Sequence, residues 1–198
     1  MADPKKEAWN NQFRLKRADG TYAFVEEHAY MVRDFGGKPI RMIGVLRDQT
    51  EQNITQLLKN TEEKIAGHFR KELELPEILS LVLKELMGVG SWLTGEIWLS
   101  NKETSQVVIA AAEGCWVEDS LYGVNPKPMV SLQKREGLPA MIWNQKQVVT
   151  WNNLSQEPDV LRKDWIDSYE INVALGMPFV YGNEIIGVAL LFGKEEIF

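Results

Sequence analysis

The chain has 198 residues, 44% of them hydrophobic, which is enough for one domain of ordinary size with a smaller partner or for two small domains. Its formal net charge of -6 repels nucleic-acid phosphates, and no Lys/Arg-rich stretch offsets that charge. One cysteine and two histidines supply neither an internal disulfide nor a zinc-ligand cluster. No stretch has the character of a signal peptide or a membrane span. We therefore expect a cytoplasmic protein with no metal, no nucleic-acid partner and no membrane contact.

Residues 1–50 carry the pattern of a small antiparallel sheet. Gln12–Arg17 alternates polar with apolar side chains and precedes the hairpin signal Asp19-Gly20. A β-prone run at Thr21–Asp34 ends at a glycine pair, and Ile40–Arg47 resumes the strand pattern. The segment is therefore predicted to be a three-stranded antiparallel meander.

The same segment resembles the C-terminal half of PAS domains, known as the PAC motif. The resemblance is carried by Phe13–Leu15, Asp19–Tyr22, Gly37–Pro39, Ile43-Gly44 and Arg47–Glu51. The helical first half of a PAS domain supplies one wall of the ligand pocket, and it has no counterpart before Trp9. The resemblance therefore implies half of a PAS domain at residues 1–50, without a complete sensor pocket.

A connecting helix is predicted at residues 51–73. Asp48–Glu51 has the form of a capping box, in which the Asp48 carboxylate accepts the amide three residues on and Glu51 reaches back. The segment lacks proline and is rich in helix formers. Steps of four and three residues mark a weak coiled-coil seam, for which a solvated helix with one apolar stripe is the alternative. The seam comprises Ile54, Leu58, Thr61, Ile65 and His68.

Residues 74–198 mix helices and strands. The first helix begins near Pro76 and has an apolar face made of Ile78, Leu79, Val82, Leu83, Leu86 and Met87. Strands are predicted at Gly95–Ser100, Gln106–Ala112, Gln147–Trp151, Gly176–Tyr181 and Glu184–Phe192, the last two joined by a tight turn at Gly182-Asn183. Further helices are predicted at Gly137–Trp143 and Val160–Tyr169. The Gly/Pro-containing loop at Gly114–Pro128 is typical of a loop that closes over a pocket.

This order of elements resembles a GAF domain. The motifs that carry the resemblance are Glu136–Ala140 with Trp143, Gln147–Val149, Gly176–Phe179 and Ile185–Phe192. They are most similar to GAF modules of bacterial sensor histidine kinases and diguanylate cyclases. The family continues into a long helix, whereas this chain stops at Phe198. The resemblance implies an α+β fold: a PAS-type meander, a connecting helix and a GAF domain whose C-terminal helix is missing, as an excerpt of a larger protein.

The resemblance also implies a sensory input fragment. Its GAF domain would bind a small molecule and relay a conformational signal to an output kinase or cyclase domain of the parent chain. Asp48, Thr50 and Glu51 would pass strain from the sheet into the helix, which we expect to be stiff from about Thr50 into the GAF domain. A structural dimerisation platform that relays a signal without a ligand stays open. The sensor requires an internal cavity with polar contacts, and the platform requires a filled core with a large apolar interface.

We expect no catalysis from this chain. Free methionine sulfoxide reductases share the GAF fold, but their nucleophilic cysteine is resolved by other cysteines and Cys115 stands alone, which makes this the least favoured alternative. Bilin-binding modules carry histidine after the attachment cysteine, whereas Trp116 follows here. Asn152–Gln156 does not supply the cyclic-nucleotide signature, and both histidines precede the domain, which disfavours haem or non-haem iron.

The GAF segment is rich in tryptophan, and two interpretations of that composition remain open. The tryptophans either line a cavity for a planar or cationic organic ligand or fill the core. The candidate ligand-binding residues are Trp98, Cys115, Trp116, Trp151, Trp165, Met177 and Phe179. We expect Cys115 to be a buried small hydrophobe rather than a sensor thiol, and His68 to be a surface residue rather than a pH switch.

The first segment is too small to bury a core alone. Its apolar side chains would expose a patch larger than soluble monomers usually carry. They are Phe13, Leu15, Tyr22, Phe24, Tyr30, Ile40, Met42 and Ile43. We therefore predict a two-fold homodimer in which this sheet takes part.

Overall fold

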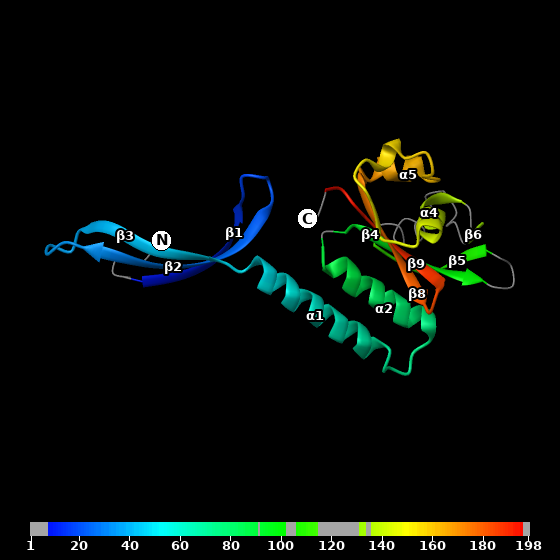
Figure 1. Cartoon of the computed structure of the whole chain (residues 1–198), viewed down its shortest axis with the longest axis horizontal. Helices are drawn as coiled ribbons and strands as arrows, with labels where there is room; N and C mark the ends of the chain where they lie inside the picture. The colour runs from blue at the N-terminus through cyan, green and yellow to red at the C-terminus, as the bar shows by residue number, and fades with distance from the viewer. Residues whose placement is uncertain (1–7, 91, 102–105, 115–130, 134–135, 196–198) are drawn as a thin grey trace. The chain divides into compact units, whose positions relative to one another are not determined.

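The computed structural model describes residues 8–90, 92–101, 106–114, 131–133 and 136–195 (Figure 1). Packing divides the chain into two compact units, one comprising Met1–Asn60 and the other Thr61–Ile197. In the described part of the chain, no helix combines the length and apolar character needed to cross a membrane.

The first unit contains an antiparallel sheet in the order β1-β2-β3. Its strands are β1 (Ala8–Lys16), β2 (Tyr22–Arg33) and β3 (Pro39–Asp48). The two tight connections contain Gly20 and Gly37 with φ of 92° and 80°, a backbone conformation that glycine adopts without steric penalty. The predicted three-stranded meander is confirmed.

The strand register divides the side chains of this sheet between two faces, here called face A and face B. Phe13 pairs with Val25 and Leu15 with Ala23, so these residues share face A. Face A also carries Ala29, Met42 and Leu46. Face B carries Tyr22, Phe24, Tyr30, Ile43 and Val45, interspersed with Arg14, Lys16, Arg41 and Arg47.

The expectation of a single apolar patch on this sheet is therefore wrong. Successive side chains of a strand point to opposite faces of the sheet. The residues predicted to form one patch were grouped without regard to this alternation. Face A is the more apolar one, and Ala23, Val25 and Ala29 are buried on it. Leu46 on face A and Val45 on face B are both exposed, at 56% and 67% of their surface.

Helix α1 spans Thr50–His68 and has no buried residue. The connecting helix predicted at residues 51–73 is confirmed over most of its length, but α1 ends at His68, and α2 (Leu75–Gly88) begins separately, close to the start predicted near Pro76. Pro76 lacks a backbone N–H and its ring would clash with the preceding turn of a continuous helix. Instead, Glu74 and Glu77 form a capping box that starts α2.

His68 is not the surface residue that the sequence led us to expect. Its side chain is only 13% exposed, and Nε2 lies 3.3 Å from Oε1 of Glu85 on α2. Lys64, one turn earlier on α1, places Nζ 3.1 Å from the other oxygen of Glu85. The hydrogen bond from Lys64 is the main cause that lowers the pKa of Glu85. The last turns of α1 are thus bound to α2 by polar contacts.

The second unit is built on a six-stranded antiparallel sheet in the order β6-β5-β4-β9-β8-β7. Its strands are β4 (Thr94–Asn101), β5 (Gln106–Gly114), β6 (Ser131–Gln133), β7 (Val149–Trp151), β8 (Val173–Tyr181) and β9 (Glu184–Gly193). The remaining elements are α4 (Gly137–Gln145), the 3-10 turn η1 (Leu154–Gln156) and α5 (Lys163–Ser168).

Helices cover both faces of this sheet (Figure 1). Helix α2 packs Leu79 and Leu83 against Ile97 and Leu191 on one face. Helices α4 and α5 and the turn η1 cover the other face, where the larger apolar cluster forms around Trp98 and other side chains of β4 and β9. This arrangement confirms the predicted antiparallel sheet with flanking helices.

Glycine allows α4 to lie directly on β8. A Cβ at Gly176 would come within 2.2 Å of Cδ1 of Ile142, a side chain of α4 that is fully buried. Any larger residue at position 176 would therefore push α4 away from the sheet.

Most element predictions for this unit are confirmed, with shifted ends. The helix predicted at Val160–Tyr169 is shorter, at Lys163–Ser168, and the strand predicted from Gln147 begins at Val149. The short elements β6 and η1 were not predicted. The predicted loop at Gly114–Pro128 lies, apart from Gly114, outside the described residues.

The larger apolar side chains of face A are exposed, and this predicts self-association of the intact chain. They are Phe13 at 40%, Leu15 at 45%, Met42 at 53% and Leu46 at 56% of their surface. Burying exposed apolar side chains such as Leu46 against a second copy removes them from water. We expect sedimentation equilibrium to show a dimer at micromolar concentration, and a chain that starts at Leu73 to be monomeric.

Two adjacent residues provide a matched test of the face involved. Leu46→Lys on face A should weaken the dimer, whereas Val45→Lys on face B should leave it intact. A monomeric intact chain at high micromolar concentration contradicts the prediction.

Candidate functional site

A fully buried carboxylate lies between the sheet of the second unit and the helices α4 and α5. Glu96 on β4 is 0% exposed. Its Oε1 accepts a hydrogen bond of 2.6 Å from Nη1 of Arg162, and its Oε2 accepts one of 2.9 Å from Nη2. Trp98 Nε1 donates a further bond of 2.9 Å to Oε2. The charge is therefore paired in a bidentate geometry, which is the strongest form of such contacts.

Local structure brings these three side chains together. Glu96 and Trp98 are two residues apart on one strand and so point to the same face of the sheet. Arg162 immediately precedes α5 and reaches β4 across 66 residues of sequence. Its guanidinium carbon also lies 5.3 Å from the centre of the Trp165 ring, within the range of a cation–π contact.

A small apolar cavity adjoins the ion pair. Its volume is about 30 Å³, enough for one water-sized molecule. Its lining includes Trp98, Leu138, Arg162, Trp165, Leu190 and Phe192. Apart from Arg162, these lining side chains are apolar or aromatic, so a guest would meet polar groups on the side of the ion pair.

Only part of the predicted ligand-binding set meets at this cavity. Trp98 and Trp165 line it. Trp151 is buried in the same cluster without lining the cavity, and Met177 and Phe179 pack in the other cluster, on the α2 side of the sheet. Successive side chains of β8 point to opposite faces of the sheet. Met177 and Phe179 therefore cannot share a face with Ala174, which lies on the α4 side. Cys115 and Trp116 lie outside the described residues.

Sequence reasoning missed both charged residues of the site. Glu96 lies between Gly95 and Ile97 in the strand predicted at Gly95–Ser100, and a charged residue inside a predominantly apolar strand was the available signal. Arg162 fell inside a segment predicted to be helical. Within the described part of the chain, no three His, Cys, Asp or Glu side chains gather as metal ligands.

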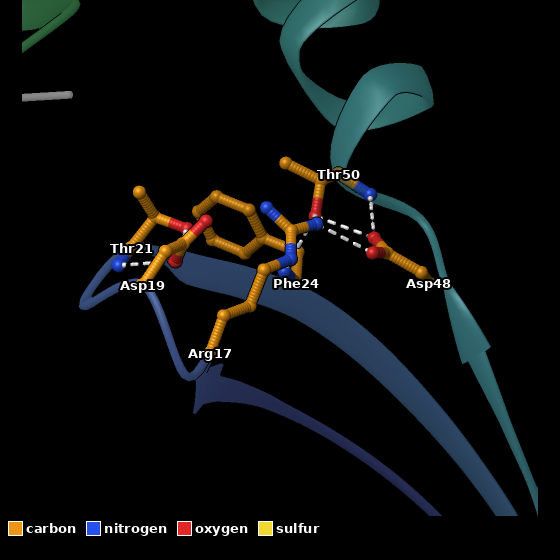
Figure 2. Close-up of polar contacts among 6 residues, drawn as sticks. All are labelled: Arg17, Asp19, Thr21, Phe24, Asp48 and Thr50. Atoms are coloured by element: carbon orange, nitrogen blue, oxygen red, sulfur yellow. Dashed lines mark hydrogen bonds and ion pairs between the residues drawn. The ribbon is translucent and has the colours of Figure 1, made fainter.

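A second arrangement of polar groups joins β3 to α1 in the first unit (Figure 2). Asp48 Oδ1 accepts hydrogen bonds from the backbone N–H and the hydroxyl of Thr50, at 2.9 and 2.5 Å. Asp48 Oδ2 lies 2.5 Å from Nη2 of Arg17, which follows β1. The Thr50 hydroxyl oxygen also accepts a bond of 2.9 Å from the Phe24 N–H on β2.

These contacts differ by one residue from the predicted capping box. Asp48 binds the amide two residues on rather than three. Glu51 lies in the first turn of α1, and among the described contacts its carboxylate does not return to Asp48. Thr50, rather than Glu51, therefore supplies the amide that binds Asp48. Its hydroxyl also links the start of α1 to Phe24 on the middle strand of the sheet.

The turn between β1 and β2 contains the same arrangement of an aspartate that binds the threonine two residues later. Asp19 Oδ1 accepts bonds from the backbone N–H and the hydroxyl of Thr21, at 3.0 and 2.7 Å (Figure 2). In both Asp-x-Thr pairs, the threonine hydroxyl is the main cause that lowers the pKa of the aspartate. The pKa of Asp19 lies below its ordinary value, and that of Asp48 falls from 3.8 to about 2.

The chain belongs to the GAF domain family, whose model matches residues 72–198. A PAS fold model matches residues 2–46, so a PAS segment precedes the GAF domain. A search of curated proteins found no match. A GAF domain is consistent with a sensory or regulatory role.

Solved structures support the fold. The GAF domain of an Acinetobacter phosphoenolpyruvate-protein phosphotransferase matches with 19% identity and a TM-score of 0.54, over 72% of this chain and 77% of that one. The nlh2 GAF domain of A. aeolicus in an inactive state matches with 18% identity and a TM-score of 0.58, over 72% and 83%. The free methionine-R-sulfoxide reductase of Neisseria meningitidis matches with 15% identity and a TM-score of 0.54, over 72% and 74%.

Breaking the buried ion pair should be far more harmful than breaking an exposed one. Arg162→Met leaves the Glu96 carboxylate buried without a cation, so we expect a loss of about 3–5 kcal/mol in the free energy of unfolding, measured with urea. Combining it with Glu96→Gln should recover part of this loss.

The pair of Lys194 and Glu170 supplies the matched control, since its side chains are 49% and 79% exposed. Lys194→Met should change the free energy of unfolding by too little to measure. If Arg162→Met and the double variant Glu96→Gln/Arg162→Met lose the same free energy of unfolding, Glu96 is not an unpaired buried charge in the single variant, and the prediction is contradicted.

Asp48→Ala should loosen the first turn of α1. It removes the acceptor of the Thr50 amide, so hydrogen exchange in the first turn should accelerate. Asp19→Ala, which removes the same device from the β1–β2 turn, should leave that exchange unchanged, and equal effects of both variants would count against the cap.

The junction should also respond to acid. Because the pKa of folded Asp48 is below its ordinary value, its ionised form stabilises the fold at pH above about 4. That contribution is lost as the pH falls through about 2. NMR titration of the Asp48 side chain should give this low midpoint, and a midpoint at the ordinary value would contradict the contacts described.

Proposed function

We propose that this chain is a non-catalytic sensory input module of a cytoplasmic signalling protein, whose GAF domain binds a small molecule beside Glu96 and Arg162. The observation that carries the proposal is the buried ion pair next to an aromatic cavity. Apolar residues of similar volume would stabilise a purely structural core as well or better. Charged groups held in a cleft are instead typical of sites that recognise a ligand.

Signal transfer is proposed to pass through the β3–α1 junction. Thr50 joins the first turn of α1 to the backbone of Phe24, and Asp48 joins it to Arg17. A shift of β2 would therefore move the start of the helix. The resemblance to sensor proteins supports a homodimer and a kinase or cyclase output domain in the parent chain.

A dimerisation platform without a ligand is the second candidate. Two observations favour it: the cavity beside the ion pair is only about 30 Å³, far below the roughly 300 Å³ of ordinary ligand pockets, and face A of the PAS sheet is apolar. This candidate needs neither Glu96 nor Arg162 for signalling.

Native mass spectrometry of the intact chain, purified from its own host, should distinguish the two. We expect one retained small molecule per chain, and we expect it to be absent from a folded Glu96→Gln/Arg162→Met variant. The bare polypeptide mass together with a stable dimer would favour the platform.

An assay with free methionine sulfoxide tests the non-catalytic part of the proposal. Reduction by the purified chain above background would overturn it.

A further inference from the structure

We propose that the ligand of the GAF site is a small organic cation, an amine or guanidinium compound, that replaces the Arg162 guanidinium on the Glu96 carboxylate. Arg162 then acts as a tethered competitor that fills the site when no ligand is present. This inference rests on the proposed function and names the chemical class of its ligand.

Glu96 is the fixed member of the ion pair. It lies on β4 in the interior of the sheet, paired with Ala112 on one side and Leu190 on the other. Strand pairing on both sides prevents the backbone from moving, and the side chain is 0% exposed. The carboxylate therefore cannot turn toward water, and whatever fills the site must neutralise it.

Arg162 is the member that can leave. It lies outside regular structure, immediately before the six-residue helix α5. Its side chain is 13% exposed and its neighbour Leu161 is exposed, so Arg162 lies close to the protein surface. Rotation about the side-chain bonds would carry the guanidinium into water, where it is well solvated, without moving any strand.

The surroundings of the guanidinium already form a binding site for a cation. Two carboxylate oxygens accept its N–H groups, and the Trp165 ring lies 5.3 Å from its central carbon. The cavity of about 30 Å³ adjoins the guanidinium, since its lining includes Arg162 together with Trp98 and Phe192. A ligand head group would take the place of the guanidinium, and a short apolar tail would occupy the space vacated by the Arg162 side chain together with the adjoining cavity.

Charge excludes the other classes of ligand. An anion that displaced Glu96 from Arg162 would leave the carboxylate buried without a cation, and an anion that shared the guanidinium would lie close to a second negative charge. A neutral molecule would leave the pair intact and find room for only one water-sized group. A cation keeps the carboxylate neutralised throughout the exchange.

Four probes of similar size test this on the wild-type chain at constant ionic strength. They are n-butylammonium, ethylguanidinium, butyrate and n-butanol. Thermal unfolding and tryptophan fluorescence should show saturable binding of the two cations only.

Variants of the intact chain test the competitor. Arg162→Ala removes the tethered cation, so the apparent affinity for the cationic probes should rise about tenfold or more. If this variant folds poorly, millimolar ethylguanidinium should restore its thermal transition, and butyrate should not. Arg162→Lys keeps a competitor with fewer donors and should give an intermediate affinity, while Glu96→Gln should abolish binding.

The outcomes separate this inference from the proposed function. Saturable binding of butyrate or n-butanol, or cation binding that Glu96→Gln leaves unchanged, overturns the cation proposal. A neutral or anionic molecule retained in native mass spectrometry also overturns it and leaves the sensory function standing. No binding of any probe, with the bare mass of the chain, overturns both.

Discussion

The ion pair between Glu96 and Arg162 ties the start of α5 to the sheet of the GAF domain. A buried carboxylate must be neutralised, and the bidentate geometry allows only a narrow range of positions for Arg162. Because Arg162 directly precedes α5, the pair also fixes Trp165, which packs edge-on against Phe192 with ring centres 5.8 Å apart. The packing of α5 on this side of the sheet is therefore tied to one buried charge.

The fold was largely predictable because its signals are local. The turn at Gly182-Asn183 joins β8 to β9, and the apolar spacing of α2 buries Ile78, Leu79, Val82 and Leu83 as predicted. The errors occurred where the local signal is weak or was overlooked. The strand β6 has three residues and no readable period, and the helix-favouring run at residues 51–73 obscured the end of α1 at His68.

The site was predictable only in part, since composition identifies apolar residues but not the face on which they lie. Trp98 and Trp165 were found, whereas Phe179 proved to be on the opposite side of the sheet. Glu96 would ordinarily be assigned to the surface, because isolated charges are rarely buried. Its partner is 66 residues away, and no single-sequence pattern reports a contact of that separation.

Helix α1 has no buried core residue of its own, unlike the sheets of the two domains. Its described attachments are polar: Thr50 and Asp48 at its start, Lys64 and His68 near its end. Polar contacts of exposed or partly exposed groups contribute little each, and they can exchange with water. A helix anchored in this way can shift at either end at low free-energy cost, while the apolar cores on which its anchors rest keep their packing.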